Sequence, residues 1–533
     1  MIYDVIIVGG GIAGLTCSAY LAKAGKKVLL IEKNNETGGL VNSFNHNGFT
    51  FDAGVKSLLN AGIIFPMLKQ LDINIETLKS PVTVGLENDI LNIEKPEDIE
   101  KYKELLVKFY PESKKEVLRI IKKIKSIMRY FDILYGIDNP IFKDLNKDIS
   151  FLFGKLLPWL PKFLFTIVNI NRLKIPVENY LRKIVKNQSL MDNIIQHFFK
   201  NTPAFFALGY FSLYLNYFYP KGGIGKLALA IEKKVLENKG EIKINTKIIE
   251  IDTAKKAIKD EQGKIYNYKY LVWAADLKTF YKITKVDELS ESIKKKFYLK
   301  KEKIFKYRGN DSVITTFIEV DEPVETFKKI SYGHFFYTPS RKGLGELHRK
   351  KLDHILSNFD SYSKEEILIW LKDFLRYNTF EISIPVIRDI DLAPYGKTGL
   401  IVSFMAEYEL FKKIKDAGWL NEFISEIEIN LINLLTDSIY PMLKDKIIAK
   451  FSFSPLSIES RVGSSEGSIV GWAFEREIPA VNNMLKVNSS ILTPIDHIYQ
   501  IGQWVYSPAG VPMSVLTGKI AADKIIKGKF YES

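Results

Sequence analysis

The 533-residue sequence predicts an α/β fold, α+β overall, in which a parallel-sheet domain carries an inserted mixed-sheet and helical domain. Three observations predict it. The chain opens with a strand, a glycine turn, a helix and a second strand; it becomes rich in strand-forming segments from residue 312; and it closes with a strand at 498–502 and a helix at 511–527, as at its start. A chain of this length exceeds one core, so we expect two or three domains.

The first element is a strand, because the apolar run 5–8 reads as a buried parallel strand. Gly9, Gly11 and Gly14 follow it with G-x-G-x-x-G spacing and open a helix at 13–24. Gly9 permits the tight turn, Gly11 lets the backbone approach a pyrophosphate, and Gly14 lets the helix pack closely on the strand. Glu32 ends the second strand, where a carboxylate can accept hydrogen bonds from a ribose. This Rossmann-type unit predicts a dinucleotide site, compatible with NAD or FAD.

Composition and charge indicate a globular protein with a basic surface. Hydrophobic residues make up 46% of the chain, which is typical of a globular protein, and the formal net charge is +14. We expect the anionic partner of this charge to be a membrane surface and not nucleic acid. The single cysteine, Cys17, reads as a small buried residue and gives no sign of an oxidising compartment. With no secretory signal in the sequence, we expect a cytoplasmic protein, bound peripherally on the inner face of the membrane.

Four segments between the predicted sheets carry information on surfaces and pockets. Residues 113–131 form a basic amphipathic helix, and residues 151–168 are apolar but contain two prolines and two lysines, which favours a short interfacial segment over a spanning helix. Buried helical core is the alternative for 151–168. Residues 203–220 are uncharged to Tyr219 and rich in Phe and Tyr, as in a pocket wall, although ordinary core is also compatible. Residues 294–308 are basic, as in a solvated face or an anionic-lipid contact.

The polar residues suggest no metal or nucleophile chemistry. The six histidines are scattered singly, no metal-ligand spacing occurs, and no G-x-S-x-G motif is present, so we expect no metal site. Lys56, Arg461 and Glu466 are the polar groups nearest to the motifs, but a structural ion pair or a solvated position is the favoured explanation for each. The sequence therefore assigns no catalytic side chain.

Further motifs are spread over almost the whole chain. Together they are more specific than any one of them. Besides the glycine unit, they comprise Gly38-Gly39, the run 48–54 (GFTFDAG), the run 219–223 (YPKGG), the run 391–397 (DLAPYGK), the run 467–472 (GSIVGW), and Gly502-Gln503 with the runs 509–512 (AGVP) and 517–518 (TG). In this order, they resemble the phytoene desaturase, carotenoid isomerase and retinol saturase-like family of FAD-dependent oxidoreductases.

The resemblance implies a Rossmann-type FAD-binding domain that is discontinuous in sequence, with residues 1–85, 220–290 and 480–533. It implies a helical, membrane-facing subdomain at 86–219 and a β-sheet substrate domain at 291–479. It further implies that FAD contacts Gly9, Gly11, Ile12, Ala13, Gly14, Glu32, Lys33, Gly38, Gly39, Leu40, Asp52, Gly54, Val55, Ile248, Ala274, Gly502, Gln503, Val511 and Pro512.

The function that the resemblance implies is desaturation, saturation or cis-trans isomerisation of C=C bonds in a long apolar polyene or isoprenoid. Two alternatives are a flavin amine oxidase-type enzyme and a non-catalytic prenyl-lipid-binding protein on the same fold. Leu40 stands where amine oxidases often have arginine after the paired glycines, which disfavours the first. Gln503 stands where many flavoproteins have aspartate, but glutamine can still hydrogen-bond ribityl hydroxyls.

Overall fold

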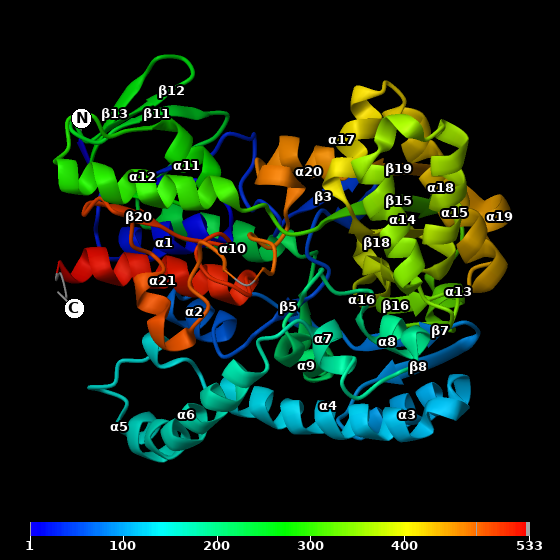
Figure 1. Ribbon diagram of the computed structural model, residues 1–533. Helices are drawn as coiled ribbons and strands as arrows, with labels where there is room; N and C mark the ends of the chain where they lie inside the picture. Colours follow the sequence, from blue (N-terminus) through cyan, green and yellow to red (C-terminus); the bar gives the residue numbers. More distant parts are fainter. Residues whose placement is uncertain (1, 476, 529–533) are drawn as a thin grey trace.

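The computed structural model describes residues 2–475 and 477–528, and its N-terminal part is built on an eight-stranded sheet, the first sheet (Figure 1). Its strand order is β10-β2-β1-β13-β12-β11-β14, with β20 beside β13. β10, β2, β1, β13 and β20 are parallel, as the glycine motif predicts. The strands are β1 (Ile2–Val8), β2 (Val28–Ile31), β10 (Glu241–Lys243), β11 (Ile248–Asp252), β12 (Ala257–Asp260), β13 (Ile265–Trp273), β14 (Thr284–Lys285) and β20 (Ile498–Gln500).

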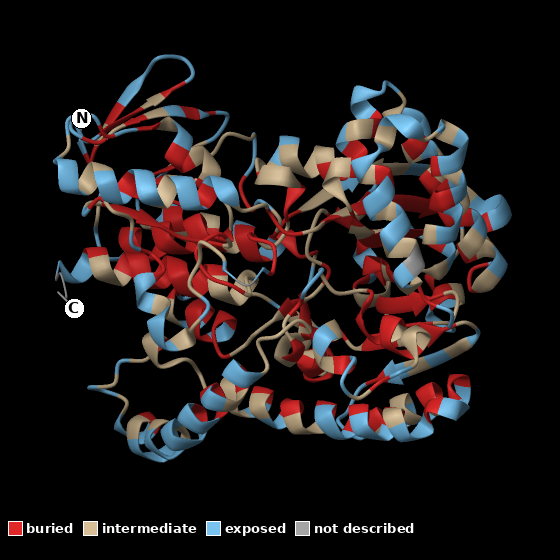
Figure 2. Ribbon diagram, in the orientation of Figure 1, coloured by how far each residue is buried: buried red, intermediate tan, exposed pale blue. Residues whose placement is uncertain are grey.

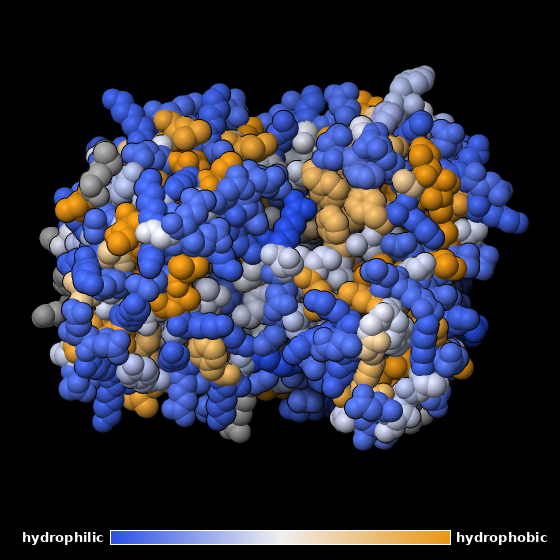
Figure 3. All heavy atoms as spheres, turned by 90° about the horizontal axis from the view of Figure 1, so that it is seen from above, coloured by the Kyte–Doolittle hydropathy of each residue, from blue (hydrophilic) through white to orange (hydrophobic). Residues whose placement is uncertain are grey.

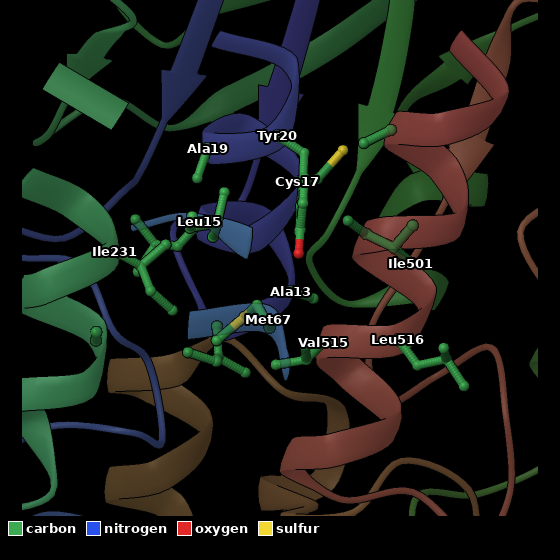
Figure 4. Packing of buried hydrophobic residues seen from close by; sticks show 14 of the residues in the cluster. Ala13, Leu15, Cys17, Ala19, Tyr20, Met67, Ile231, Ile501, Val515 and Leu516 are labelled. Carbon is green, nitrogen blue, oxygen red and sulfur yellow. The ribbon is translucent and has the colours of Figure 1, made fainter. Parts of the chain in front are cut away.

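Helix α1 (Ile12–Lys23) is the centre of this part, because α10 and the C-terminal helix α21 flank it. Figure 4 shows its buried side chains, among them Cys17, between Ile231 of α10 and Val515 of α21. Cys17 is fully buried, which confirms its prediction as a small core residue. The last helix of the chain is thus packed against the first, as the return of the sequence pattern predicts.

A seven-stranded sheet, the second sheet, forms the other half of the molecule in the order β19-β15-β18-β17-β16-β7-β8. It is antiparallel except where β16 runs parallel to β7. One face packs its aliphatic and aromatic residues against α14, α15, α17 and α18 (Figures 1 and 2). The strands are β7 (Val82–Leu86), β8 (Asp89–Ile93), β15 (Ser312–Val320), β16 (His334–Thr338), β17 (Phe380–Ser383), β18 (Thr398–Ala406) and β19 (Ile447–Phe453).

Two small sheets and a layer of helices connect the halves. The small sheets are β3 (Ser43–His46) with β4 (Phe49–Asp52), and β5 (Leu58–Leu59) with β9 (Tyr217–Pro220) and β6 (Thr77–Lys79). Helices α3 to α6 run along one edge of the molecule, at the bottom of Figure 1. The remaining helices are α2 (Ile64–Gln70), α3 (Asp98–Phe109), α4 (Lys114–Tyr135), α5 (Ile149–Phe151), α6 (Leu157–Arg172), α7 (Val177–Leu181), α8 (Gln188–Ile195), α9 (Ala204–Tyr214), α10 (Gly225–Glu237), α11 (Leu277–Ile283), α12 (Glu291–Lys306), α13 (Val324–Lys328), α14 (Gly345–Ser357), α15 (Lys364–Tyr377), α16 (Pro385–Arg388), α17 (Tyr408–Asp416), α18 (Leu420–Ser438), α19 (Leu443–Lys446), α20 (Pro455–Val462) and α21 (Val511–Lys527).

Two segments lie on the other side of the domain boundaries expected from the sequence. β7 falls mostly within the expected 1–85 unit, but it pairs with β16 in the second sheet. α12 falls within the expected 291–479 unit, but Phe297 and Ile304 of α12 are buried in the core of the first sheet with Trp273. In both cases a long-range contact decides the assignment, and a local pattern cannot reveal it.

The apolar segment 151–168 is part of a longer helix than the sequence predicts. α5, a π turn at Leu152–Leu156 and α6 form one continuous helix, Ile149–Arg172. Among the described residues, it is the one helix long and apolar enough to cross a membrane by length and composition, and 17% of its apolar window is buried. Pro158 does not end it, because proline is tolerated in the first turn of α6.

Candidate functional site

A cavity of about 820 Å³, the central cavity, joins the two halves of the molecule. Its size is that of a site for a cofactor or a sizeable ligand. One end is lined by the glycine turn after β1 and by the N-terminal turn of α21. The other end is lined by alternate residues of β15, β16, β17 and β18, on the face opposite the helix-covered core, because successive side chains of a strand point to opposite faces.

Glycine makes the first end possible. Gly9 has φ of 110°, and a Cβ there would lie 2.8 Å from the carbonyl carbon of Ala274. A Cβ on Gly14 would lie 2.0 Å from the oxygen of Gly9, so only glycine lets α1 approach β1 this closely. Gly11 differs from both, because a Cβ there would meet nothing within 4 Å and the residue lines the cavity. Gly11 therefore exposes bare backbone to the cavity.

Glu32 closes this end at the tip of β2. Its Oε2 accepts a hydrogen bond from the Gly10 N–H at 2.7 Å, and its Oε1 accepts one from the Asn34 N–H at 2.9 Å. A carboxylate has about four acceptor positions, so two remain for hydroxyl groups of a ligand. The side chain lines the cavity, which is the arrangement that a ribose requires.

Two helix N-termini also face the cavity. Gly11 and Gly510 are the N-cap residues of α1 and α21, and neither helix start has a side-chain cap among the described residues. The first N–H groups of a helix have no intrahelical partner and carry partial positive charge. The cavity thus offers anion-binding backbone at two places, which fits the pyrophosphate and the ring of a dinucleotide.

All of the site residues expected from the sequence line the central cavity except Gly14 and Asp52. Gly14 lies beneath the turn, as described above. Asp52 is fully buried and accepts hydrogen bonds from Ser43 Oγ at 2.7 Å, Tyr219 Oη at 2.8 Å and the Ile224 N–H at 2.9 Å. Asp52 therefore joins the end of β4 to β3, to β9 and to the start of α10, and it does not itself line the cavity.

The other end of the cavity is largely aromatic. Phe206, Tyr210 and Leu213 of α9 line it with Tyr217 of β9, which confirms the prediction that segment 203–220 is a pocket wall. Phe336 of β16 also lines this end, and its ring packs 5.3 Å from that of Tyr214 of α9. Such a surface suits an apolar ligand.

A group of polar side chains interrupts this apolar end. We call it the cavity-wall cluster; its members are Lys56, Ser57, His334, Glu381 and Arg388. The imidazole of His334 lies between Glu381 Oε1, 2.9 Å from Nε2, and Ser57 Oγ, 2.9 Å from Nδ1. Arg388 donates to the Lys56 carbonyl at 2.7 Å and stacks 4.0 Å from the Tyr219 ring. Lys56, Ser57, His334 and Glu381 line the cavity.

The charge states of the cluster follow from burial. Burial lowers the pKa of His334, which leaves the ring neutral so that its Nε2–H donates to Glu381. Burial by itself raises the pKa of Glu381, but the His334 hydrogen bond and the charge of Lys56 outweigh it, so the pKa lies below its ordinary value. Burial also lowers the pKa of Lys56. The cluster thus holds a carboxylate beside a neutral imidazole.

Of the three polar groups that the sequence singles out, only Lys56 lines the cavity. Arg461 pairs with Glu36 at 2.6 Å, and Glu466 pairs with Lys278 at 2.5 Å, so both have structural partners. Sequence reasoning missed His334 and Glu381. The signal available for them was a polar residue within an otherwise apolar strand, which becomes informative only once the facing strands are known.

Comparison with known proteins agrees with this geometry. Residues 7–71 match the model of the NAD(P)-binding Rossmann-like domain. The chain is 24% identical to prolycopene isomerase 1 of an Oncidium hybrid cultivar, over 98% of this chain and 84% of the relative. It is 23% identical to all-trans-retinol 13,14-reductase of Danio rerio, over 94% and 82%, and 23% identical to a 4,4'-diapophytoene desaturase of Staphylococcus aureus (strain COL), over 98% and 98%.

The fold also occurs among solved structures. A putrescine oxidase is similar with a TM-score of 0.61 and 12% identity, covering 99% of both chains. This likeness confirms the predicted fold class. The Rossmann-like match supports a dinucleotide site at the glycine-lined end of the cavity.

Proposed function

We propose that this chain is an FAD-dependent oxidoreductase of polyenes, because it is similar over almost its whole length to a prolycopene isomerase, an all-trans-retinol 13,14-reductase and a 4,4'-diapophytoene desaturase. Its substrate is a long apolar polyene or isoprenoid, in which it desaturates, saturates or isomerises C=C bonds. When bound, the flavin supplies the acceptor or donor of a hydride. The protein binds the substrate, orients it and excludes water.

The residues at the glycine-lined end fit FAD. Gly9 and Gly11 with the N-terminus of α1 would hold the pyrophosphate, Glu32 the adenosine ribose, and Ile248 and Ala274 the adenine region. The N-terminus of α21, with Val511 and Pro512, together with Gly54, Val55, Gly502 and Gln503, would hold the ribityl chain and ring. The dipole of α21 would stabilise negative charge on a reduced ring.

The observation that carries the proposal is that one cavity connects the glycine-lined end with the aromatic end. A flavin held at the first end would share this cavity with an apolar chain bound at the aromatic end. The aromatic wall removes water from that space, and no group of His, Cys, Asp and Glu able to hold a metal ion occurs among residues 2–475 and 477–528. Positioning against the flavin is then the main contribution of the protein.

The test is reconstitution of the purified chain with FAD, followed by anaerobic incubation with phytoene, prolycopene or all-trans-retinol. We expect bound flavin and a product that differs in double-bond number or geometry. In a parallel aerobic incubation, peroxide production from an amine such as putrescine, with no change in any polyene, would support amine oxidase chemistry instead. Absence of bound flavin would support a non-catalytic lipid-binding protein.

We also propose peripheral membrane contact through the helix Ile149–Arg172. Its inner side packs on α4, and Trp159 Nε1 donates to the Ile133 carbonyl at 2.6 Å, so the helix lies along the protein. This favours an interfacial over a spanning position, since the outer side remains free. Its exposed apolar residues are Ile149, Phe153, Leu157, Leu160, Leu164, Phe165 and Val168.

Segment 294–308, for which the sequence also allows lipid contact, does not lie on the same side of the molecule as the helix Ile149–Arg172. The basic helix α12, covering most of 294–308, lies on the side of the molecule opposite to α4–α6 in Figure 1. The face seen in Figure 3, viewed from that opposite side, is mostly hydrophilic with scattered apolar patches. We therefore assign the membrane contact to α4–α6 alone.

Liposome flotation tests this assignment with vesicles of phosphatidylcholine and phosphatidylglycerol. The double substitution Phe153→Glu and Phe165→Glu, at side chains exposed by 64% and 67%, is expected to abolish flotation. Ile369→Glu on α15, at a residue exposed by 60%, is the matched control and is expected to float as the native protein does. Equal flotation of all three proteins would rule out this face.

A further inference from the structure

Glu381 occupies an unusual position for a carboxylate. It lies on β17 opposite Phe336 of β16 and Ser403 of β18, on the face of the second sheet that lines the central cavity. Its side chain is 35% accessible, whereas that of its partner His334 is 2% accessible. Because the residue lies deep between strands, this accessible surface faces the cavity and not the exterior. A charge in an apolar cavity is unfavourable unless it is solvated, paired or used.

Glu381 also differs from the other carboxylates of the cavity wall. Both oxygens of Glu32, Asp276 and Glu459 accept hydrogen bonds from backbone N–H groups or from Tyr408 Oη. Glu381 Oε1 contacts His334, whereas Oε2 has no hydrogen-bond partner among the described residues. Among the described residues, Glu381 forms an ion pair with His334 and with no Lys or Arg.

The other titratable groups of this region are less suited to take up a proton. A protonated Lys56 side chain has no lone pair with which to accept a proton. Its Nζ donates a hydrogen bond to the Asp52 carbonyl oxygen at 3.4 Å. Burial raises the pKa of Tyr210 to about 12 and raises that of Tyr217 further, so both hydroxyls stay protonated. Burial lowers the pKa of His197 to about 4. The groups that face Glu381 or act on its charge are Lys56, His197, Tyr210, Tyr214, Tyr217, His334 and Arg388.

We propose that Glu381 is the proton-exchanging group of the polyene reaction, and this rests on the proposed function. In the desaturating direction two C–H bonds on neighbouring carbons break and one C=C bond forms. When bound, the flavin would supply the acceptor for the hydride with its electron pair, and the proton from the adjacent carbon goes to Glu381 Oε2. In the saturating direction the same oxygen returns the proton. A quinone or dioxygen is the class of acceptor that restores the flavin.

His334 and Ser57 are positioning residues for Glu381. The His334 ring is held by Ser57 on one side and stacks on Tyr217 at 5.5 Å with an interplanar angle of 14°, which fixes the Nε2–H toward Glu381. Ser57 Oγ lies 2.8 Å from Ser80 Oγ, and Arg388 donates to both hydroxyls at 3.4 and 3.3 Å. This row of hydroxyls and imidazole offers the proton a route away from the cavity. Because the pKa of Glu381 lies below its ordinary value, the carboxylate is ionised near neutral pH and its Oε2 lone pairs are free to take a proton.

The test compares Glu381→Gln and Glu381→Asp with the native holoenzyme, with the substrate that the native protein converts among phytoene, prolycopene and all-trans-retinol. The matched control is Glu319→Gln, because Glu319 also lies on the second sheet and pairs with a histidine, His46, at 2.5 Å, but is fully buried and does not line the cavity. Flavin content, thermal unfolding and the infrared carboxylate band are measured for each protein. kcat, KM and their dependence on pH follow.

We expect Glu381→Gln to retain flavin and KM within about 3-fold, to lose about 100-fold or more in kcat, and to lose the acidic limb of the pH profile. Glu381→Asp restores part of kcat, and Glu319→Gln changes stability without changing the pH profile. An ionised band at pH 7 that disappears in Glu381→Gln is expected even without substrate. Native turnover that Glu381→Gln retains within about 3-fold overturns this inference alone. Absence of any native turnover overturns the proposed function, and this inference with it.

Discussion

The pair Gly11→Ala and Gly14→Ala separates cofactor binding from folding in the same turn. Gly11 has φ of −69°, which alanine adopts freely, and its Cβ would enter open space in the cavity. Gly11→Ala is therefore expected to leave the stability of the cofactor-free protein unchanged or raised by about 0.4–1 kcal/mol, because alanine restricts the unfolded chain. Gly14→Ala forces a contact of 2.0 Å with the Gly9 oxygen, so the turn must shift.

Gly11→Ala, which is harmless to the stability of the cofactor-free protein, is expected to weaken the binding of FAD. The added methyl occupies the space in which a phosphate would approach the backbone, and losing that approach costs about 1.4–3 kcal/mol, or roughly 10- to 100-fold in Kd. Thermal unfolding of cofactor-free protein and fluorescence titration with FAD measure the two effects. Gly14→Ala should lower the stability of the cofactor-free protein by about 1–3 kcal/mol. Unchanged FAD affinity in Gly11→Ala would refute the position of the pyrophosphate.

Two further predictions concern stability. Phe51→Ala should destabilise the protein by about 3–5 kcal/mol, because the fully buried Phe51 ring contacts Phe44, Phe49, Phe317 and Phe451. Chemical denaturation measures this loss, and a value below about 1 kcal/mol would contradict the prediction. Burial lowers the pKa of His197, His348 and His497 to about 4, so the unfolded chain takes up protons below pH 6.5 that the native protein does not. As the pH is lowered from 6.5 to about 4, the free energy of unfolding should fall by up to about 1.4 kcal/mol per pH unit for each histidine. His497→Gln should reduce this slope, and equal slopes in the native protein and the variant would contradict the prediction.

The residues of the glycine-lined end could be brought together from the sequence because they are neighbours in the chain. Gly9, Gly11 and Glu32 lie within one strand-helix-strand unit, whose geometry fixes where each residue lies. The cavity-wall cluster could not be predicted in this way. Ser57, His334 and Glu381 come from a loop and from two strands far along the chain, and only the pairing of β16 with β17 brings them together.

The misplaced boundaries have the same physical origin. β7 joins the second sheet through β16, more than two hundred residues away, and α12 packs on the first sheet through two residues of its inner face. The long apolar helix was underestimated for a local reason. Pro158 and Pro161 favoured a short segment, but Pro158 lies in the first turn of α6, where proline is tolerated, and the helix continues through Pro161.

The most direct test of the central claim is the pigment content of a carotenoid-producing host that expresses the chain, measured by chromatography and mass spectrometry. We expect a polyene that gains or loses pairs of hydrogen atoms, or that changes retention at the same mass, in cells with the native chain. Gly11→Ala should diminish that change in proportion to its loss of FAD. Flavin-loaded native protein with unchanged polyenes would contradict the claim.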